Sequence, residues 1–326
     1  MPALAITDHG NMYGVKEFLK VAKKYPDIKP IIGCEVYVTK HYDHKLKDKD
    51  HRSYYHLILL AKNYEGYRNL MKIVSIGHIE GKYSRPRVSH EVLAKYHDNL
   101  ICCSACLGGE LPQKVMQGLH NQDFTEAEQT IEWFKALFGE DYYIELQRHQ
   151  TDKPRADQHT YQVQKMVNEV LVQLARKHNV KIIATNDVHF VEEEHAEAHD
   201  RLICLSTSKD LDDPKRMLYS KQEWMKTRAE MNAIFEDVPE ALSNTVEICN
   251  KVESYSIDHA PIMPTFEIPE EFGTEEEYRA RLTEQDLFDE FTRDENGNVV
   301  MEEAEAHKKI EKLGGYDKLY RIKLEA

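Results

Sequence analysis

Residues 3–10 read Ala-Leu-Ala-Ile-Thr-Asp-His-Gly, a short apolar run that ends in polar side chains. Residues 181–189 read Lys-Ile-Ile-Ala-Thr-Asn-Asp-Val-His and repeat that order later in the chain. Short apolar runs with such boundaries are typical of buried strands. The two stretches therefore predict strands that carry imidazole and carboxylate groups at their carboxyl ends.

Similar runs alternate with helical stretches along the first 200 residues. The strand-like runs are Ala3–Thr7, Pro30–Val38, Tyr55–Ala61, Leu100–Ser104, Tyr142–Leu146 and Lys181–Thr185. This alternation favours a parallel α/β fold, either a doubly wound sheet or an incomplete barrel. No strand is followed by a Gly-x-Gly-x-x-Gly turn, which argues against a dinucleotide-binding fold.

Helices are expected over 14–24, 64–78, 125–139, 157–178, 199–206, 221–235 and 239–251. Thr125 and Glu128 have the spacing of a capping box at the start of the third helix. The fourth helix has an apolar face made of Val163, Met166, Val167, Val170, Leu171 and Leu174. Near the C-terminus, Asn296-Gly297 predicts a hairpin turn.

The composition is that of a globular protein, with 41% hydrophobic and 31% charged residues and no apolar run of membrane-spanning length. The N-terminus lacks the features of a signal peptide. Cys102, Cys103 and Cys106 crowd together, which indicates a reducing compartment and metal or catalytic use. We therefore expect a cytoplasmic protein.

The net charge of −14 is unevenly distributed, since residues 267–326 hold 18 acidic and 9 basic side chains. A surface that grips duplex DNA needs a basic stripe, and the sequence shows none. Contact with nucleic acid would therefore be local, in a pocket, or would run through a larger protein.

Side chains of metal-binding types accompany four of the six predicted strands. They are Asp8 and His9, Cys34 and Glu35 within an interruption of the second strand, Cys106, and Asp187 with His189. The carboxyl ends of parallel strands face the active site in α/β folds. Imidazole and carboxylate suit zinc, manganese and iron, and thiolate favours zinc. The pattern alone predicts a metal-dependent hydrolase.

Each candidate also has a simpler interpretation. His9 taken alone fits an ordinary strand-end histidine as well as it fits a ligand. Glu35 needs a partner or a cation, because it is a carboxylate inside an apolar strand. Asp187 and His189 are two residues apart, so they point the same way from an extended chain. His56 lies near the start of its strand, where a surface histidine is the default interpretation.

Other chemistries have weaker support in the sequence. Cys103 and Cys106 have redox spacing but lie in a strand-to-glycine turn. The segment 294–298 resembles a calcium loop, but its glycine comes too early in the segment. The chain contains no Gly-x-Ser-x-Gly, Walker A or His-Glu-x-x-His motif.

Five segments resemble, in order, motifs of the PHP (polymerase and histidinol phosphatase) domain of bacterial DNA polymerase III alpha subunits. They are residues 4–14, 31–37, 56–70, 104–110 and 184–190. The resemblance covers residues 1–265, and residues 314–319 resemble the lead-in to the polymerase palm. It implies a distorted (β/α)7 barrel with up to three metal ions at the carboxyl ends of the strands.

The resemblance implies the metal ligands His9, Glu35, His56, Cys106, Asp187 and His189. Glu35 would bridge two cations, with His56 and Cys106 on one of them. His9 and His189 would share another cation, and Asp187 would serve a third. The cations would be zinc or manganese, and a metal-activated water would be the nucleophile, with Asp187 and Glu35 as supporting carboxylates.

The same resemblance implies part of a DNA-directed DNA polymerase, a nucleotidyltransferase of DNA replication with magnesium in its palm. The domain itself would be a 3′–5′ exonuclease or phosphoesterase. Implied partners are primer-template DNA, deoxynucleotides, the sliding clamp, the clamp loader and a proofreading subunit, with no membrane. The alternatives are a free-standing PHP phosphoesterase for a small phosphomonoester and a non-catalytic docking module.

The family opens with a His-x-His strand upstream of the position of Met1, and its palm acids lie downstream of Ala326. We therefore expect a fragment with an incomplete barrel over 1–200, a helical completion over 201–265, and an acidic linker with the start of the palm region over 266–326. We expect this chain alone to be inactive in synthesis and weak or inactive in hydrolysis.

Overall fold

The computed structural model describes residues 1–264 and 273–325. These residues form two compact units, Met1–Asp258 and His259–Ala326. The predicted division of the first unit at residue 200 stays a prediction, and the boundary expected at 265–266 lies outside the described residues.

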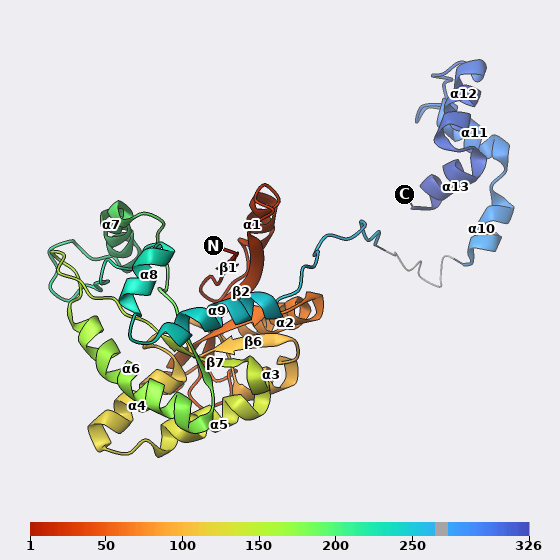
Figure 1. Cartoon of the computed structure of the whole chain (residues 1–326). Coiled ribbons are helices and arrows are strands. Elements are labelled where there is room, and N and C mark those ends of the chain that lie inside the picture. Colours follow the sequence, from red (N-terminus) through yellow and green to blue (C-terminus); the bar gives the residue numbers. More distant parts are fainter. Residues whose placement is uncertain (265–272, 326) are drawn as a thin grey trace. The chain divides into compact units, whose positions relative to one another are not determined.

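A curled sheet forms the centre of the first unit (Figure 1). Its strands are β1 (Ala3–Ile6), β2 (Lys29–Thr39), β3 (Tyr54–Ala61), β4 (Lys82–Tyr83), β5 (Arg85–Val88), β6 (Leu100–Cys103), β7 (Tyr142–Leu146) and β8 (Lys181–Ala184). The order is β4-β5-β2-β3-β6-β7-β8, with β1 paired to β2. All six predicted strands are confirmed, and the α/β fold is an incomplete barrel. The short strands β4 and β5 were not predicted.

The expectation of a wholly parallel sheet is wrong at β3, which is antiparallel to both β2 and β6. No helix lies between β2 and β3, so the chain returns through a loop and the second strand runs in the opposite direction. The expected interruption of β2 is also wrong. Residues 29–32 pair with β1 and residues 33–39 pair with β3, so the strand changes its pairing partner without a break.

Nine helices of four residues or more accompany this sheet within Met1–Asp258. They are α1 (Val15–Ala22), α2 (Tyr64–Ile79), α3 (His90–Tyr96), α4 (Glu110–Asn121), α5 (Thr125–Phe138), α6 (His159–His178), α7 (Ala196–Thr207), α8 (Arg228–Ile234) and α9 (Pro239–Lys251). The seven predicted helices are confirmed, although α8 occupies only the second half of its predicted range. The helices α3 and α4 were not predicted.

Two details of the helices differ from expectation. The N-cap of α5 is Phe124 without a side-chain cap, because Asp123 accepts the hydrogen bond from the Thr125 backbone instead. The buried face of α6 includes Val167 and Leu171 but leaves Met166 half exposed. That face also buries Gln164 and other small or polar side chains, so it is rotated away from Met166.

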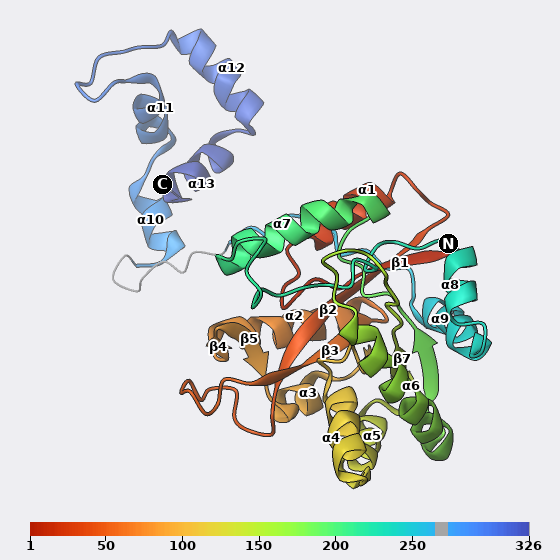
Figure 2. The ribbon, with the colours of Figure 1, turned by 90° about the vertical axis from the view of Figure 1, so that its left-hand side faces the viewer.

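The core fills the space between the sheet and its helices. Its largest cluster joins Leu57 and Leu59 of β3 to Phe134 of α5 and Leu171 of α6. In Figure 2, β1, β2 and β3 lie beside one another, with α4, α5 and α6 grouped on the β7 side. The packed sheet gives the strand ends fixed positions.

The second unit contains α10 (Glu275–Arg281), α11 (Glu284–Thr292), α12 (Glu303–Leu313) and α13 (Tyr316–Glu325). Leu287, Ile310 and Leu319 form its small core. The predicted turn at Asn296-Gly297 is confirmed by an antiparallel bridge between Arg293 and Val299. None of the helices in the described part of the chain is both long and apolar enough to cross a bilayer.

Candidate metal centre

Backbone hydrogen bonds bring the candidate side chains to one edge of the sheet. The Gly10 N–H donates to the Glu35 carbonyl at 2.8 Å, which fixes the turn after β1 against β2. The His56 N–H donates to the Gly108 carbonyl at 2.9 Å, which fixes the start of β3 against the loop after β6. Because β3 is antiparallel, its start lies at the edge where β6 ends. His56 is therefore in the cluster, and the default surface interpretation is wrong.

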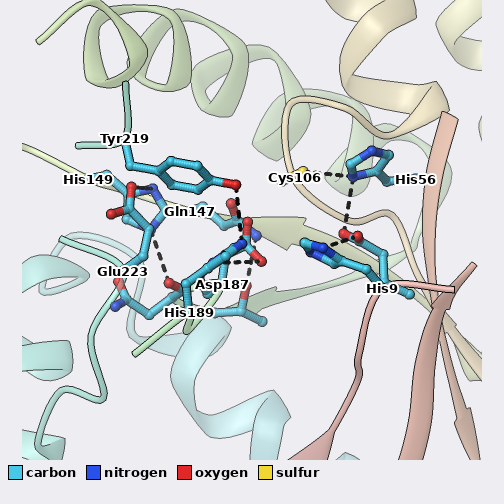
Figure 3. Close-up of polar contacts among 12 residues, drawn as sticks. His9, His56, Cys106, Gln147, His149, Asp187, His189, Tyr219 and Glu223 are labelled. Carbon is cyan, nitrogen blue, oxygen red and sulfur yellow. Dashed lines mark hydrogen bonds and ion pairs between the residues drawn. The ribbon is translucent and has the colours of Figure 1, made fainter. Parts of the chain in front are cut away.

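Glu35 is the centre of the cluster, and only 3% of it is exposed. Its Oε1 accepts a hydrogen bond from His56 Nδ1 at 3.1 Å, and the same nitrogen lies 3.6 Å from Cys106 Sγ (Figure 3). One possible ligand atom from each of these three residues lies within 4.8 Å of the other two. Carboxylate, imidazole and thiol are thus close enough to share one cation.

The second carboxylate oxygen of Glu35, Oε2, lacks a hydrogen-bond donor among the described residues. Oε2 is buried and lies 3.2 Å from His9 Nε2, yet this contact lacks hydrogen-bond geometry. No hydrogen-bond donor within residues 1–264 and 273–325 reaches that oxygen. A buried carboxylate oxygen without a donor is costly, and a bound cation would satisfy it. The donor set therefore fits a divalent cation.

Asp187 and His189 lie on the other side of His9. The rings of His9 and His189 are 5.4 Å apart between centroids. His189 Nδ1 donates to the Asp187 carbonyl at 2.6 Å and lies 4.0 Å from Oδ1 of the same residue. Its Nε2 faces the Tyr219 hydroxyl at 3.5 Å. The structure thus brings all six predicted ligands into one region, where Figure 3 labels His9, His56, Cys106, Asp187 and His189, and Glu35 lies against His9 and His56.

Two turns of this cluster hold non-glycine residues in the left-handed region. Ala105, after β6, has φ of +63°, and Asp187, after β8, has φ of +43°. Such conformations cost free energy and persist where the surroundings enforce them, commonly at functional sites. Gly109 adds a steric constraint, since a Cβ there would lie 2.0 Å from the Ser104 carbonyl oxygen. The loop that carries Cys106 is therefore tightly constrained.

The protonation states of the cluster follow from burial and neighbouring groups. Burial raises the pKa of Glu35, but the hydrogen bond from His56 and the charges of nearby histidines outweigh it and bring the pKa below its usual value. Burial raises the pKa of the Cys106 thiol well above its usual value, and the charge of Asp187 adds to the rise. Without a cation the thiol stays protonated, and a bound cation would favour the thiolate.

Glu145 of β7 is a site residue that the sequence interpretation missed. Its carboxylate accepts hydrogen bonds from the Ala105 N–H at 3.1 Å and from the Thr185 hydroxyl, so it joins the turns after β6 and β8. Burial raises the pKa of Glu145 to about 7. The signal was available, because Tyr-Tyr-Ile-Glu-Leu places a carboxylate in an apolar strand, as at Glu35.

The sequence interpretation also missed His149 and Glu223, which support the turn that carries Asp187. His149 is buried, and its Nε2 lies 3.2 Å from the Asn186 carbonyl oxygen. Glu223 accepts hydrogen bonds from Ser220, and its backbone carbonyl accepts the His189 N–H at 2.8 Å. Both side chains come from loops without a strand-like pattern, so periodicity gave no signal for them.

A broad open hollow of about 2000 Å³ adjoins the cluster. It lies between β1, the end of β8 and the helices α8 and α9, and its lining includes His9, Glu35, Asp187 and His189. The cluster therefore borders a space that can hold a sizeable solute, while Glu35 itself is buried.

Comparison with known proteins relates the first part of the chain to a known family. Residues 1–149 match the family model of the PHP domain. These residues are therefore similar to a PHP domain. The matched residues include His9, Glu35, His56 and Cys106, whereas Asp187 and His189 lie beyond them. The match to the PHP domain, together with the candidate ligand group of Glu35, His56 and Cys106 in the matched residues, indicates divalent-metal binding.

Relatives extend the similarity beyond the PHP domain. The DNA polymerase III subunit alpha of Borreliella burgdorferi is 43% identical over 286 residues, which cover 87% of this chain and 24% of that protein. The same subunit of Treponema pallidum is 40% identical over 93% of this chain and 24% of its own length. That of Thermus aquaticus is 38% identical over 86% of this chain and 22% of its own length. The chain thus spans about a quarter of these relatives.

Proposed function

We propose that this chain is the PHP-domain region of a DNA polymerase III alpha subunit and that its strand-end cluster is a divalent-metal phosphoesterase centre. The relatives support the first part, because their similarity covers 93% of the chain in one case and so reaches into the second unit. A free-standing PHP phosphatase would not require that extension.

The carboxylate of Glu35, which has one oxygen without a hydrogen-bond donor in the described part of the chain, is the main support for a divalent-metal centre. It lies between the imidazoles of His9 and His56, and Cys106 lies beside His56. Such mixed donors suit zinc or manganese, and Glu35, which has one oxygen beside each imidazole, would contact two cations. Asp187 and His189 would supply the remaining ligands. A bound divalent cation activates water and offsets the charge of a phosphoryl group.

Within the parent polymerase, the proposed partners are primer-template DNA, deoxynucleotides, the sliding clamp, the clamp loader and a proofreading subunit. Magnesium would act in the palm, and the PHP centre would remove nucleotides from a 3′ end. We expect hydrolysis by this chain alone to be weak, because neither of the two ligand groups found among the described residues includes Asp187 or His189.

Cleavage of a 3′-labelled single-stranded oligonucleotide with manganese tests the proposed chemistry. Slow cleavage that is abolished by a chelator and by Glu35→Gln is the expected result. Glu65→Gln, an exposed change on α2, is the matched control and should leave cleavage unchanged. Cleavage that survives Glu35→Gln would refute the assignment of this centre.

A further inference from the structure

A second carboxylate lies between two imidazoles outside the strand-end cluster. His41 follows β2, His90 is the first residue of α3, and Glu110 is the first residue of α4. One possible ligand atom from each lies within 4.8 Å of the other two. Three segments far apart in the sequence thus bring metal-binding side chains to one point.

The geometry of this group is compact. Glu110 is 3% exposed, with Oε1 2.8 Å from His41 Nε2 and Oε2 2.9 Å from His90 Nε2. The two imidazole rings stack with centroids 4.6 Å apart and an interplanar angle of 12°. Both rings therefore direct Nε2 toward the same carboxylate. This arrangement would need only small side-chain movements to admit an ion.

We propose that His41, His90 and Glu110 bind a divalent transition-metal cation of the zinc class. Two imidazoles and one carboxylate are a recurrent ligand set for zinc, with a further position left to water. The side chain of His41 is 59% exposed, which gives the ion a path from solvent. The nearby cation Lys114 is paired with Glu126 at 2.5 Å, so its charge is largely balanced.

The bound ion would displace the protons that now join the imidazoles to the carboxylate. It would also brace the loop of the strand-end cluster, because Glu110 follows Gly109 directly and the Gly109 N–H donates to the Cys106 carbonyl at 2.8 Å. The second site uses none of the six strand-end ligands, so the proposal stands independently of the proposed hydrolysis.

Zinc titration of the full chain by calorimetry tests the second site. Glu35→Gln with Cys106→Ser provides a background in which the strand-end cluster is disabled. We expect one equivalent of zinc to bind in this background and the affinity to fall at least about 10-fold with His41→Ala. His120→Ala, an exposed histidine on the same helix as Glu110, is the matched control and should leave the affinity unchanged.

Cobalt provides a second readout if the double variant folds poorly. In the unmodified chain, cobalt at the strand-end cluster should show thiolate charge-transfer absorption from Cys106, whereas cobalt at the second site should not. His41→Ala should remove only the signal without thiolate character. Absence of saturable zinc binding in the background, or equal binding in the His41→Ala and His120→Ala variants, would overturn the proposal.

Discussion

The carboxylates of Glu35 and Glu110 are similarly buried, and each lies between two histidines, yet their oxygens are satisfied differently. Both oxygens of Glu110 pair with an imidazole nitrogen, at 2.8 and 2.9 Å. Only one oxygen of Glu35 has a hydrogen bond, and the other has no donor within the described residues. Neither oxygen of Glu110 is among the buried oxygens without a partner in the described part of the chain, whereas Oε2 of Glu35 is one of them, and a cation would satisfy it.

This difference predicts which of the two carboxylate sites binds a cation more tightly. A cation at Glu35 satisfies an oxygen that otherwise costs about 1–3 kcal/mol. A cation at Glu110 must first displace the protons of two existing contacts, so binding there should be weaker and more dependent on pH. The strand-end cluster should therefore fill first.

Glu35→Gln should have the largest effect on metal binding. The amide lacks the charge that a cation needs and leaves His9 and His56 without their shared anion. We expect the zinc affinity of the strand-end cluster to fall at least about 100-fold, beyond the usual cost of losing an outer-sphere partner. Zinc titration measures this, with Glu65→Gln as control. If Glu35→Gln bound zinc within a few fold of the affinity of the unchanged chain, the proposed difference between the Glu35 and Glu110 sites would be wrong.

Glu110→Gln should reveal a pH-dependent contribution to stability. Burial raises the pKa of Glu110, but hydrogen bonds from His41 and His90 outweigh it and lower the pKa from 4.5 to about 2. A depressed carboxyl pKa gives stability that is present above pH 4.5 and lost as the pH falls toward 2. The same contact raises the pKa of His41 above 6.5, so its contribution is lost again as the pH rises through that raised value.

The difference in unfolding free energy between the unchanged chain and Glu110→Gln should therefore peak between pH 4.5 and 6.5. We expect about 2–3 kcal/mol there, measured by urea denaturation of the metal-free proteins. A difference that does not vary between pH 2 and 6 would contradict the assigned contacts.

Cys106→Ser should have the smallest effect. It should change the preference between zinc and manganese without abolishing metal binding. Thiolate favours zinc over harder cations, so its removal should lower the preference for zinc over manganese about 10-fold. Competition titrations with the two metals measure this ratio. Cys204→Ser, on α7 and in neither candidate ligand group, is the control, and an equal shift in both variants would show that Cys106 is not a ligand.

The strands and most helices could be predicted from the sequence because their apolar patterns are local. The direction of β3 was missed, although no helix is expected between the second and third strands and such a connection favours an antiparallel return. That single direction decides the place of His56, which local reasoning assigned to the surface and the family resemblance assigned to the site.

In the candidate site, too, some residues could be recognised from the sequence and others could not. Glu35 was recognisable because a carboxylate inside an apolar strand needs a partner, and the same reasoning applied to Glu145 would have found it. The group of His41, His90 and Glu110 was not recognisable, because its members come from a loop and from two helices that were not predicted. Only the folded chain brings them within 4.8 Å.

X-ray absorption at the zinc edge, on the full chain loaded with one equivalent of zinc, shows whether the strand-end cluster binds the first ion. We expect this zinc to occupy the strand-end cluster, with one sulfur at about 2.3 Å and nitrogen or oxygen ligands at about 2.0–2.1 Å. A shell of nitrogen and oxygen alone would place the first zinc away from Cys106 and contradict this expectation.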